Sequence, residues 1–431
     1  MEMQYLQGFG NYLQSEAEPN VLIPGHNSPQ KVPLGLYAEQ ISGTAFAMPR
    51  VNNLHSWVYR ILPSVMHGDF KNFSHPKLLG TPFDGMTPPT QMRWGPPPYP
   101  KKPTHFVGGL MTMAGNGRID LHCGGALHLY AINQSMQDEF FYNADGDFLI
   151  VPQEGDLIFK TEFGILEVVP GEIIVIPRGI KYQVILKQEN ARGYICENFG
   201  APFRLPDLGI IGANGLANPR DFQIPVANYE QRKGNFTLIG KFQGHLWSAP
   251  IDHSPLNIVA WHGNYTPYKY NLNLFNTIAS VSFDHIDPSI FTVLTSPSTT
   301  LGVANIDFVI FPSRWIVADN TFRPPYFHRN IMSEYMGLIT GKYDAKEEGF
   351  VPGGSSLHNS MTAHGPDAEA YEKAVNQSLQ PEYYAGTLAF MFESCYVWRV
   401  TQQALTAKFR EADYLDCWKG LRWNFKYTHR E

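Results

Sequence analysis

Two histidines and one glutamate near the C-terminal end of the chain are the residues best suited to chemistry. His328 and Glu334 lie six positions apart, and His364 follows thirty residues later. On a β-strand, side chains alternate between faces, so even separations place His328, Asn330 and Glu334 on one face. Two imidazoles and one carboxylate that leave coordination positions open form the facial triad that holds Fe(II) for O2 chemistry. The segment 323–337 therefore predicts a strand that carries part of a metal site.

Other residues compete for the same roles, and spacing does not choose between them. His358 stands six positions before His364, and either histidine could complete the triad. His285 and Asp287 form a His-x-Asp pair, the half of a triad found in 2-oxoglutarate-dependent oxygenases, with His328 or His364 as the distal ligand. Alternatively, His285 lies outside the metal shell and moves a proton, because imidazole titrates near neutral pH.

The composition favours two domains rich in strands. The chain has 431 residues, of which 43% are hydrophobic and 13% aromatic, and this is enough to bury a large core. It contains 38 glycines, 33 prolines and only 17% charged residues. Such a composition favours many short strands and turns over long solvated helices.

Charge, hydropathy and cysteine usage argue against several classes of partner. The net charge of −6 is spread along the chain without a basic run, so nucleic acid is not an expected partner. The sequence has no run of eighteen apolar residues and no basic and apolar leader, so we expect neither a membrane span nor secretion. The four cysteines lie far apart without a CxxC motif, which indicates reduced thiols in a cytoplasmic protein.

Residues 104–200 carry the strongest β-pattern in the chain. Short apolar runs alternate with turns at regular intervals, which predicts a sandwich or barrel of the jelly-roll kind. The expected strands are 128–133, 147–152, 157–161, 165–169, 172–177 and 181–186.

The segment from Pro170 to Gly179 resembles the second motif of cupin barrels. Tyr182 stands where a metal-binding cupin carries its histidine. We therefore expect the first barrel to hold no metal, and we interpret His122 and His128 as hydrogen-bonded structural residues.

The flanking segments are less regular. Residues 1–110 are rich in proline and aromatic side chains and are too apolar for disorder. We expect this arm either to wrap around the fold or a neighbouring subunit, or to add strands to its own domain. Residues 201–275 are rich in loops, and their glycines match no nucleotide-binding spacing.

Residues 276–400 return to a β-pattern and predict a second barrel. The expected strands are 277–283, 289–294, 306–311, 336–343 and 387–393, together with the segment 323–337. Apolar positions in residues 402–425 predict a terminal helix. The predicted fold is mainly β, with two cupin-like jelly-roll barrels of the bicupin type. The predicted domains are 1–275, with the arm and the metal-free barrel, and 276–431, with the metal site.

Several long segments resemble the homogentisate 1,2-dioxygenase family, and the resemblance covers nearly the whole chain. These segments are Gly8–Asn11, Leu36–Gln40, Ser56–Ser64, 212–221, Val259–Leu272, Phe283–Leu294 and 323–337. Compared with the familiar cupin pattern H-x-H-x3-E, Asn330 replaces the second histidine.

The resemblance implies a role for each candidate residue. It implies a mononuclear Fe(II) held by His328, Glu334 and His364. It places Tyr343 and His364 against the substrate and makes His285 the proton acceptor. His358 matches a histidine that lines the site without binding the metal.

The resemblance also implies an activity and an assembly. The enzyme would be an oxidoreductase, an Fe(II)- and O2-dependent dioxygenase of tyrosine and phenylalanine catabolism. It would cleave the aromatic ring of homogentisate to give maleylacetoacetate. A homohexamer built as a dimer of trimers is implied, with the arm at 1–110 as the candidate interface. The alternatives that the residues leave open are a 2-oxoglutarate oxygenase built on His285 and Asp287 and a non-enzymatic bicupin.

Overall fold

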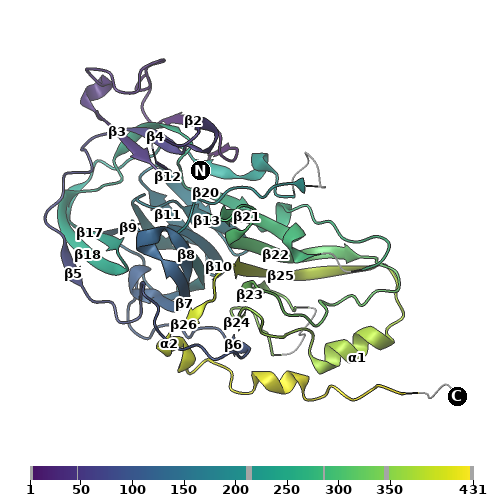
Figure 1. Cartoon of the computed structure of the whole chain (residues 1–431). Coiled ribbons are helices and arrows are strands. Elements are labelled where there is room, and N and C mark those ends of the chain that lie inside the picture. Colours follow the sequence, from purple (N-terminus) through teal and green to yellow (C-terminus); the bar gives the residue numbers. More distant parts are fainter. Residues whose placement is uncertain (1–2, 46, 210–215, 285–286, 344–348, 428–431) are drawn as a thin grey trace.

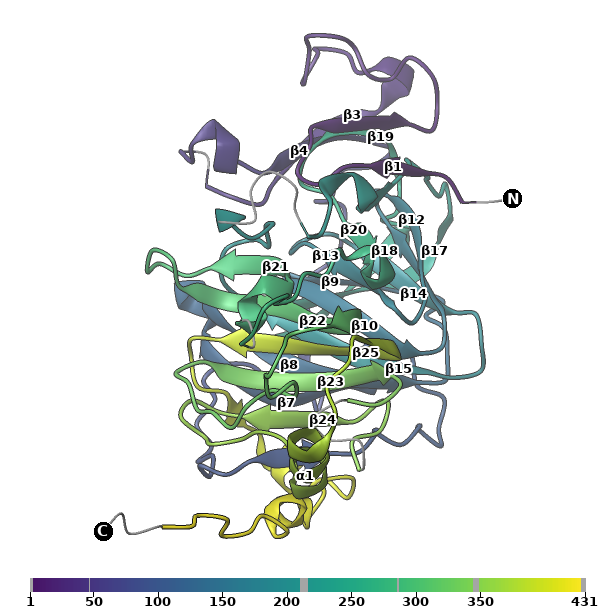
Figure 2. The ribbon, with the colours of Figure 1, turned by 90° about the vertical axis from the view of Figure 1, so that its right-hand side faces the viewer.

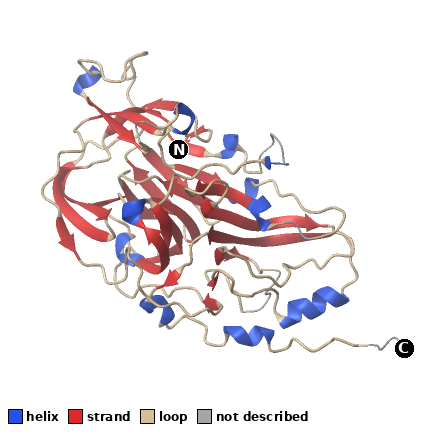
Figure 3. Cartoon of the chain, in the orientation of Figure 1, coloured by secondary structure: helices blue, strands red, loops and turns tan. Residues whose placement is uncertain are grey.

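Strands form most of the fold, and the few helices are short (Figures 1 and 3). The structure is a computed structural model that describes residues 3–45, 47–209, 216–284, 287–343 and 349–427. Within these ranges, no helix is both long enough and apolar enough to cross a membrane. The strands form four sheets of nine, seven, four and six strands.

The first two sheets build the N-terminal barrel. The nine-stranded sheet has the order β1 (Tyr5–Gln7), β16 (Gln223–Pro225), β20 (Tyr268–Asn271), β13 (Glu172–Ile176), β10 (Asp147–Glu154), β15 (Ala191–Asn198), β8 (Cys123–Ile132), β7 (Leu110–Arg118) and β26 (Arg399–Val400). The seven-stranded sheet has the order β12 (Gly164–Val168), β11 (Leu157–Thr161), β14 (Tyr182–Leu186), β9 (Glu139–Asn143), β17 (Lys233–Phe242), β18 (His245–His253) and β5 (Lys71–Phe73). All six strands predicted between 128 and 186 are present, with ends shifted by a few residues.

Aromatic and charged side chains fill the interior of this barrel. Tyr182 is buried and packs edge-on against Phe106 and Phe141. His128 is buried with its Nε2 3.0 Å from Glu197 Oε2, and Lys241 Nζ lies 2.6 Å from Glu197 Oε1. The predicted hydrogen-bonded role of His128 is confirmed. His122, by contrast, is exposed at a turn with φ of 50°.

The N-terminal arm both adds strands and wraps around the fold. The four-stranded sheet has the order β2 (Leu13–Glu16), β19 (Ile258–Gly263), β4 (His55–Arg60) and β3 (Tyr37–Ser42). Strand β5 joins the seven-stranded sheet, and β6 (Met92–Trp94) joins the edge of the six-stranded sheet. The arm therefore contributes a strand to the sheet that carries the candidate metal site.

The six-stranded sheet has the order β21 (Thr292–Pro297), β22 (Ala304–Ile316), β25 (Glu382–Ser394), β23 (Ser333–Thr340), β24 (Ser355–His358) and β6. It packs against the nine-stranded sheet, and Figure 2 shows the two layers one behind the other. At their contact the rings of Tyr194 and Phe390 meet with centroids 4.9 Å apart, and the Tyr194 hydroxyl donates to the carbonyl of Leu338. This contact buries one face of the sheet and leaves the opposite face of β23 for the site.

Four sequence predictions in the C-terminal half are wrong. The strand expected at 289–294 begins only at Thr292, because residues 288–291 form a 3-10 turn. Residues 277–283 form no strand, and Val281 and Phe283 are exposed there. The segment 323–337 is not one strand, because β23 begins only at Ser333.

The predicted terminal helix at 402–425 is also absent as a continuous element. It is replaced by the four-residue helix α2 (Gln402–Leu405) and the 3-10 turn η9 (Tyr414–Trp418). The backbone between them is held by pairing with the end of β6, where Gly95 N–H donates to Phe409 O and Glu411 N–H donates to Arg93 O. This pairing outweighs a weak helical preference. The longest helix, α1 (Ala368–Asn376), was not predicted.

Candidate metal site and substrate pocket

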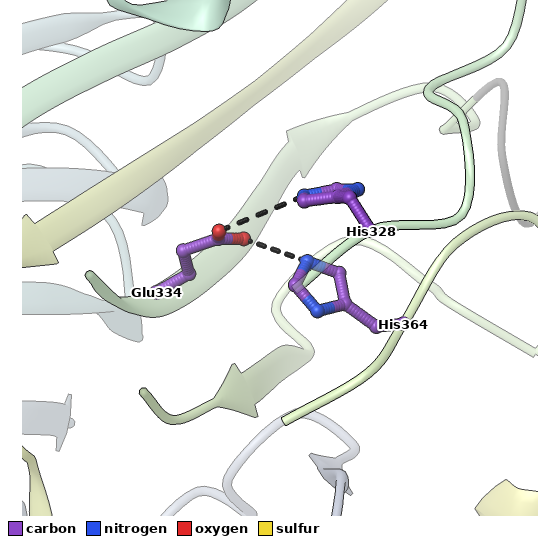
Figure 4. Close-up of side chains that lie close together, drawn as sticks. All are labelled: His328, Glu334 and His364. Carbon is purple, nitrogen blue, oxygen red and sulfur yellow. Dashed lines mark hydrogen bonds and ion pairs between the residues drawn. The ribbon is translucent and has the colours of Figure 1, made fainter. Parts of the chain in front are cut away.

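The two histidines of the candidate site lie on paired loops beside the first residues of β23 (Figure 4). His328 and His364 form an isolated antiparallel bridge, with N–H···O distances of 2.9 and 3.0 Å in the two directions. Glu334 is the second residue of β23. His328 and Glu334 therefore meet because a loop returns to the sheet, and not because they share the face of one strand.

The three side chains converge on one point. Glu334 Oε2 lies 3.0 Å from His364 Nε2, and Glu334 Oε1 lies 3.8 Å from His328 Nε2. One ligand atom from each residue lies within 4.8 Å of the other two. Among the described residues, no other group of three or more histidine, cysteine or acidic side chains lies close enough together to bind one metal ion.

Backbone carbonyls set the tautomer of both imidazoles. His328 Nδ1 lies 2.7 Å from the carbonyl of Tyr326, and His364 Nδ1 lies 2.8 Å from the carbonyl of Thr362. Because a carbonyl only accepts, each Nδ1 must carry the proton and donate it. Each ring therefore directs its Nε2 at Glu334. From there it donates to the carboxylate when Nε2 is protonated and offers a lone pair to a metal when Nε2 is not, as metal-ligating histidines do when their other nitrogen is held. The donor set fits a divalent transition metal.

The glutamate is held as a carboxylate. Burial disfavours its charged form, but hydrogen bonds from His328 and His364 outweigh burial and hold the pKa of Glu334 well below its usual range. Asn330 Nδ2 donates to Glu334 Oε1 at 2.6 Å. The amide that stands in place of a second cupin histidine thus orients the carboxylate.

A further histidine supports the site from the neighbouring strand. His358 on β24 is paired with Glu334 across the sheet, and its ring stacks on His364 with centroids 4.2 Å apart and planes 7° apart. Its Nε2 lies 2.9 Å from the hydroxyl of Tyr414 in η9. Arg93 of β6 lies 4.5 Å above the Tyr414 ring and pairs with Glu411. The C-terminal segment, which runs past β6 and α1 in Figure 1, therefore supports the candidate ligand His364 through His358.

We expect Tyr414→Phe to weaken metal binding without loss of the fold. The change removes the hydroxyl that contacts His358 and keeps the ring beneath Arg93. Groups that orient metal ligands typically contribute tenfold to hundredfold in affinity, so the affinity for a divalent metal ion should fall about tenfold. Competition with a chromophoric chelator measures it. Tyr130→Phe is the matched control, because the Tyr130 hydroxyl is buried in the N-terminal barrel without a hydrogen-bond partner among the described residues. Equal affinities in Tyr414→Phe and the parent chain would contradict the positioning role.

A cavity of 430 Å³ opens beside the three candidate ligands. Tyr343 lines it and packs edge-on against Phe311, with centroids 5.9 Å apart. Two carboxyl groups that sequence reasoning missed, Asp307 and Glu393, also line the cavity. Burial, followed by the charges of Glu334 and Asp307, raises the pKa of Glu393 well above its usual range. The available signal was an acidic residue within each of two apolar strand patterns, at 306–311 and 387–393.

The remaining candidates lie apart from the metal cluster or outside the described residues. His285 lies outside the described residues. Asp287 caps the 3-10 turn η8 (Pro288–Phe291), where its carboxylate accepts from Ser289 N at 2.9 Å. Arg323 is buried and donates to the carbonyls of Gln380 and Ala318, away from the cavity lining.

Fold and site together define a class, namely a mainly β protein whose C-terminal sheet presents, at a cavity, a His-Glu-His cluster that could hold a metal ion. The N-terminal profile of the homogentisate 1,2-dioxygenase family matches residues 4–272, and the C-terminal profile matches residues 273–425. The chain belongs to the homogentisate 1,2-dioxygenase family and is a dioxygenase.

Several solved structures also match parts of the chain. A cupin-2 domain protein from Shewanella frigidimarina is 22% identical over 17% of this chain and 70% of its own, with a TM-score of 0.16. Protein Ylba from E. coli is 12% identical over 78% of this chain and 94% of its own, with a TM-score of 0.27. A cupin 2 conserved barrel domain protein from Leptotrichia buccalis is 8% identical over 66% of this chain and 88% of its own, with a TM-score of 0.27.

Proposed function

We propose that the chain is a non-haem Fe(II) dioxygenase that opens the ring of homogentisate, with the iron held by His328, Glu334 and His364. The observation that supports this most directly is the convergence of two Nε2 atoms and one carboxylate within 4.8 Å at a cavity wall. Three protein ligands leave other coordination positions for ligands from solution. When bound, Fe(II) would bring a substrate phenolate and O2 to neighbouring positions and carry electrons between them.

The chain's own residues bind, orient and exchange a proton. We assign His285 as the base that takes the phenol proton, since imidazole titrates near the working pH. Tyr343 and His364 lie at the cavity and are proposed to contact the substrate. Met336, Phe311 and the other apolar lining exclude water from the reacting oxygen. The ring opens between the carbon that bears the acetate and its hydroxylated neighbour, and the product is maleylacetoacetate.

The biological setting is part of the same proposal. We place the enzyme in tyrosine and phenylalanine catabolism, in the cytoplasm, and as a homohexamer in which the arm at 1–110 contributes to the interface. All four cysteines are free thiols, which suits a reducing compartment. Large apolar side chains exposed on the arm and the tail, such as Val51 and Trp423, suit subunit contacts. We propose domains at 1–275 and 276–431. No observation favours the 2-oxoglutarate or the non-enzymatic alternative.

Oxygen uptake by the purified chain tests the proposed reaction. We expect rapid uptake with homogentisate when Fe(II) is added, and little with catechol, gentisate or 2-oxoglutarate. Removal of iron by a chelator under anaerobic conditions should abolish the uptake, and Fe(II) should restore it. The absence of homogentisate-dependent uptake in an iron-loaded sample would overturn the proposal.

A further inference from the structure

The order of strands in the six-stranded sheet places three carboxyl groups in one row beneath the cavity. Glu334 on β23 is paired with Glu393 on β25, which is paired with Asp307 on β22. Directly opposed residues on neighbouring antiparallel strands point to the same face, and all three side chains line the cavity. Figure 2 shows these strands side by side in that order. Adjacent strands lie about 4.8 Å apart, so Glu393 is one strand and Asp307 two strands from the metal ligand.

Two members of this row have acceptor atoms without a hydrogen-bond partner among the described residues. Glu393 is 8% exposed, and its side chain makes no hydrogen bond or ion pair with any residue in the described part of the chain. Asp307 Oδ1 is buried and has no hydrogen-bond partner among the same residues. Buried acceptors without partners are costly and uncommon. The cavity therefore presents acceptors that a bound molecule would satisfy.

The opposite side of the metal cluster carries aromatic side chains. On β24, His358 stacks on His364 and contacts Tyr414, and both line the cavity on that side. The next row on the same face of the sheet is apolar near the cluster, where Met391 on β25 is paired with Met336 on β23. A flat ring can lie on these two flexible thioethers. A ring that is bound at the metal and lies on these thioethers extends toward β25 and β22.

We propose that Glu393, assisted by Asp307, accepts a hydrogen bond from the substrate hydroxyl that lies para to the metal-bound oxygen. This inference rests on the proposed function, since it assumes a 2,5-dihydroxy ring anchored at the metal through one oxygen. The second hydroxyl then lies one ring width farther along the row of carboxyl groups. A carboxyl group keeps an accepting oxygen whether or not it is protonated, so the contact forms in either state.

The same row selects the orientation of the substrate. An acetate carboxylate placed at Glu393 and Asp307 would meet two acidic groups and lose its water shell, and it would gain a donor only from a protonated carboxyl group. A hydroxyl in that position gains an acceptor. Glu393 and Asp307 thereby act as specificity-determining residues that favour a para-dihydroxy ring over a ring with one hydroxyl.

Binding of two ligands to the Fe(II)-loaded full chain tests this role without turnover. Anaerobic calorimetry measures the dissociation constants of homogentisate and of 2-hydroxyphenylacetate, which lacks the distal hydroxyl. We expect the parent chain to bind homogentisate at least about tenfold more tightly, the size of one hydrogen bond to a buried acceptor. Glu393→Met removes the acceptor at similar volume and should bring the two constants within about threefold of each other. Glu393→Gln keeps an accepting oxygen and should retain most of the difference.

Two further variants separate this role from a structural one. Asp307→Leu should also reduce the difference between the dissociation constants of the two ligands. If Glu393→Met does not fold, Asp307→Leu serves as the test of the inference. Glu382→Gln, an exposed position at the far end of β25, should leave both constants unchanged. An unchanged ratio in Glu393→Met and Asp307→Leu, or an equal loss for both ligands, would overturn the inference while leaving oxygen uptake by the parent chain intact. An iron-loaded parent chain without homogentisate-dependent uptake would instead count against the proposed function.

Discussion

Glu334→Ala should abolish iron binding and, with it, oxygen uptake. Glu334 is the one anionic member of the metal cluster, and its two oxygens face both imidazole Nε2 atoms. Metal chemistry of this kind is worth several kcal/mol of transition-state stabilisation, and about 4 kcal/mol corresponds to a thousandfold in rate. We therefore expect residual turnover at or below about one thousandth. Elemental analysis after anaerobic reconstitution and an oxygen electrode measure the two quantities.

The matched control for this experiment is Asp287→Ala. Asp287 belongs to the rival His-x-Asp motif, but its carboxylate caps η8 and lies outside the metal cluster. This variant should therefore keep its iron. Loss of iron with Asp287→Ala and its retention with Glu334→Ala would reverse the assignment of the metal site. Circular dichroism on both variants shows that any loss of iron is not a loss of fold.

His285→Ala should keep its iron and lose most of its activity. We assign this histidine to proton transfer and not to metal binding, so iron content should match that of the parent chain. Positioned general bases typically contribute two to four orders of magnitude, and the rate should fall by about that factor. Iron content and oxygen uptake with homogentisate, measured on the same preparation, give both values.

An imidazole rescue and a control variant accompany the His285→Ala experiment. Exogenous imidazole should restore part of the lost rate, since a missing base can be supplied from solution. His245→Ala, an exposed position at the start of β18, should change neither iron content nor rate. A variant at 285 that loses its iron would show that this histidine is a ligand.

The local sequence pattern was sufficient for the fold class and for the list of candidate ligands. Alternating apolar residues between Pro and Gly turns predict strands because a strand buries every second side chain. Strand β11 was predicted with its observed ends, and β13 to within one residue. Histidine and carboxylate side chains in an apolar context mark a metal site wherever the chain brings them together.

Tertiary structure decided which of those candidates meet and what surrounds them. His328 and Glu334 come together through the bridge between residues 328 and 364, a contact that no periodicity encodes. The prediction placed them on one strand and was right about their proximity for the wrong reason. The segment 402–425 does not form the predicted helix. Its backbone instead makes hydrogen bonds with the end of β6, more than 300 residues away in the sequence.

The row of Glu334, Glu393 and Asp307 is the clearest case in which local sequence does not predict which side chains lie together. Each residue is an isolated acid in its own strand, and strand pairing over separations of 59 and 86 residues aligns them. The order of amino acids specifies the chemical groups that the chain can offer and the elements that carry them. The register of distant strands determined which groups share a face, because cross-strand neighbours are set by packing and hydrogen bonding across the whole sheet.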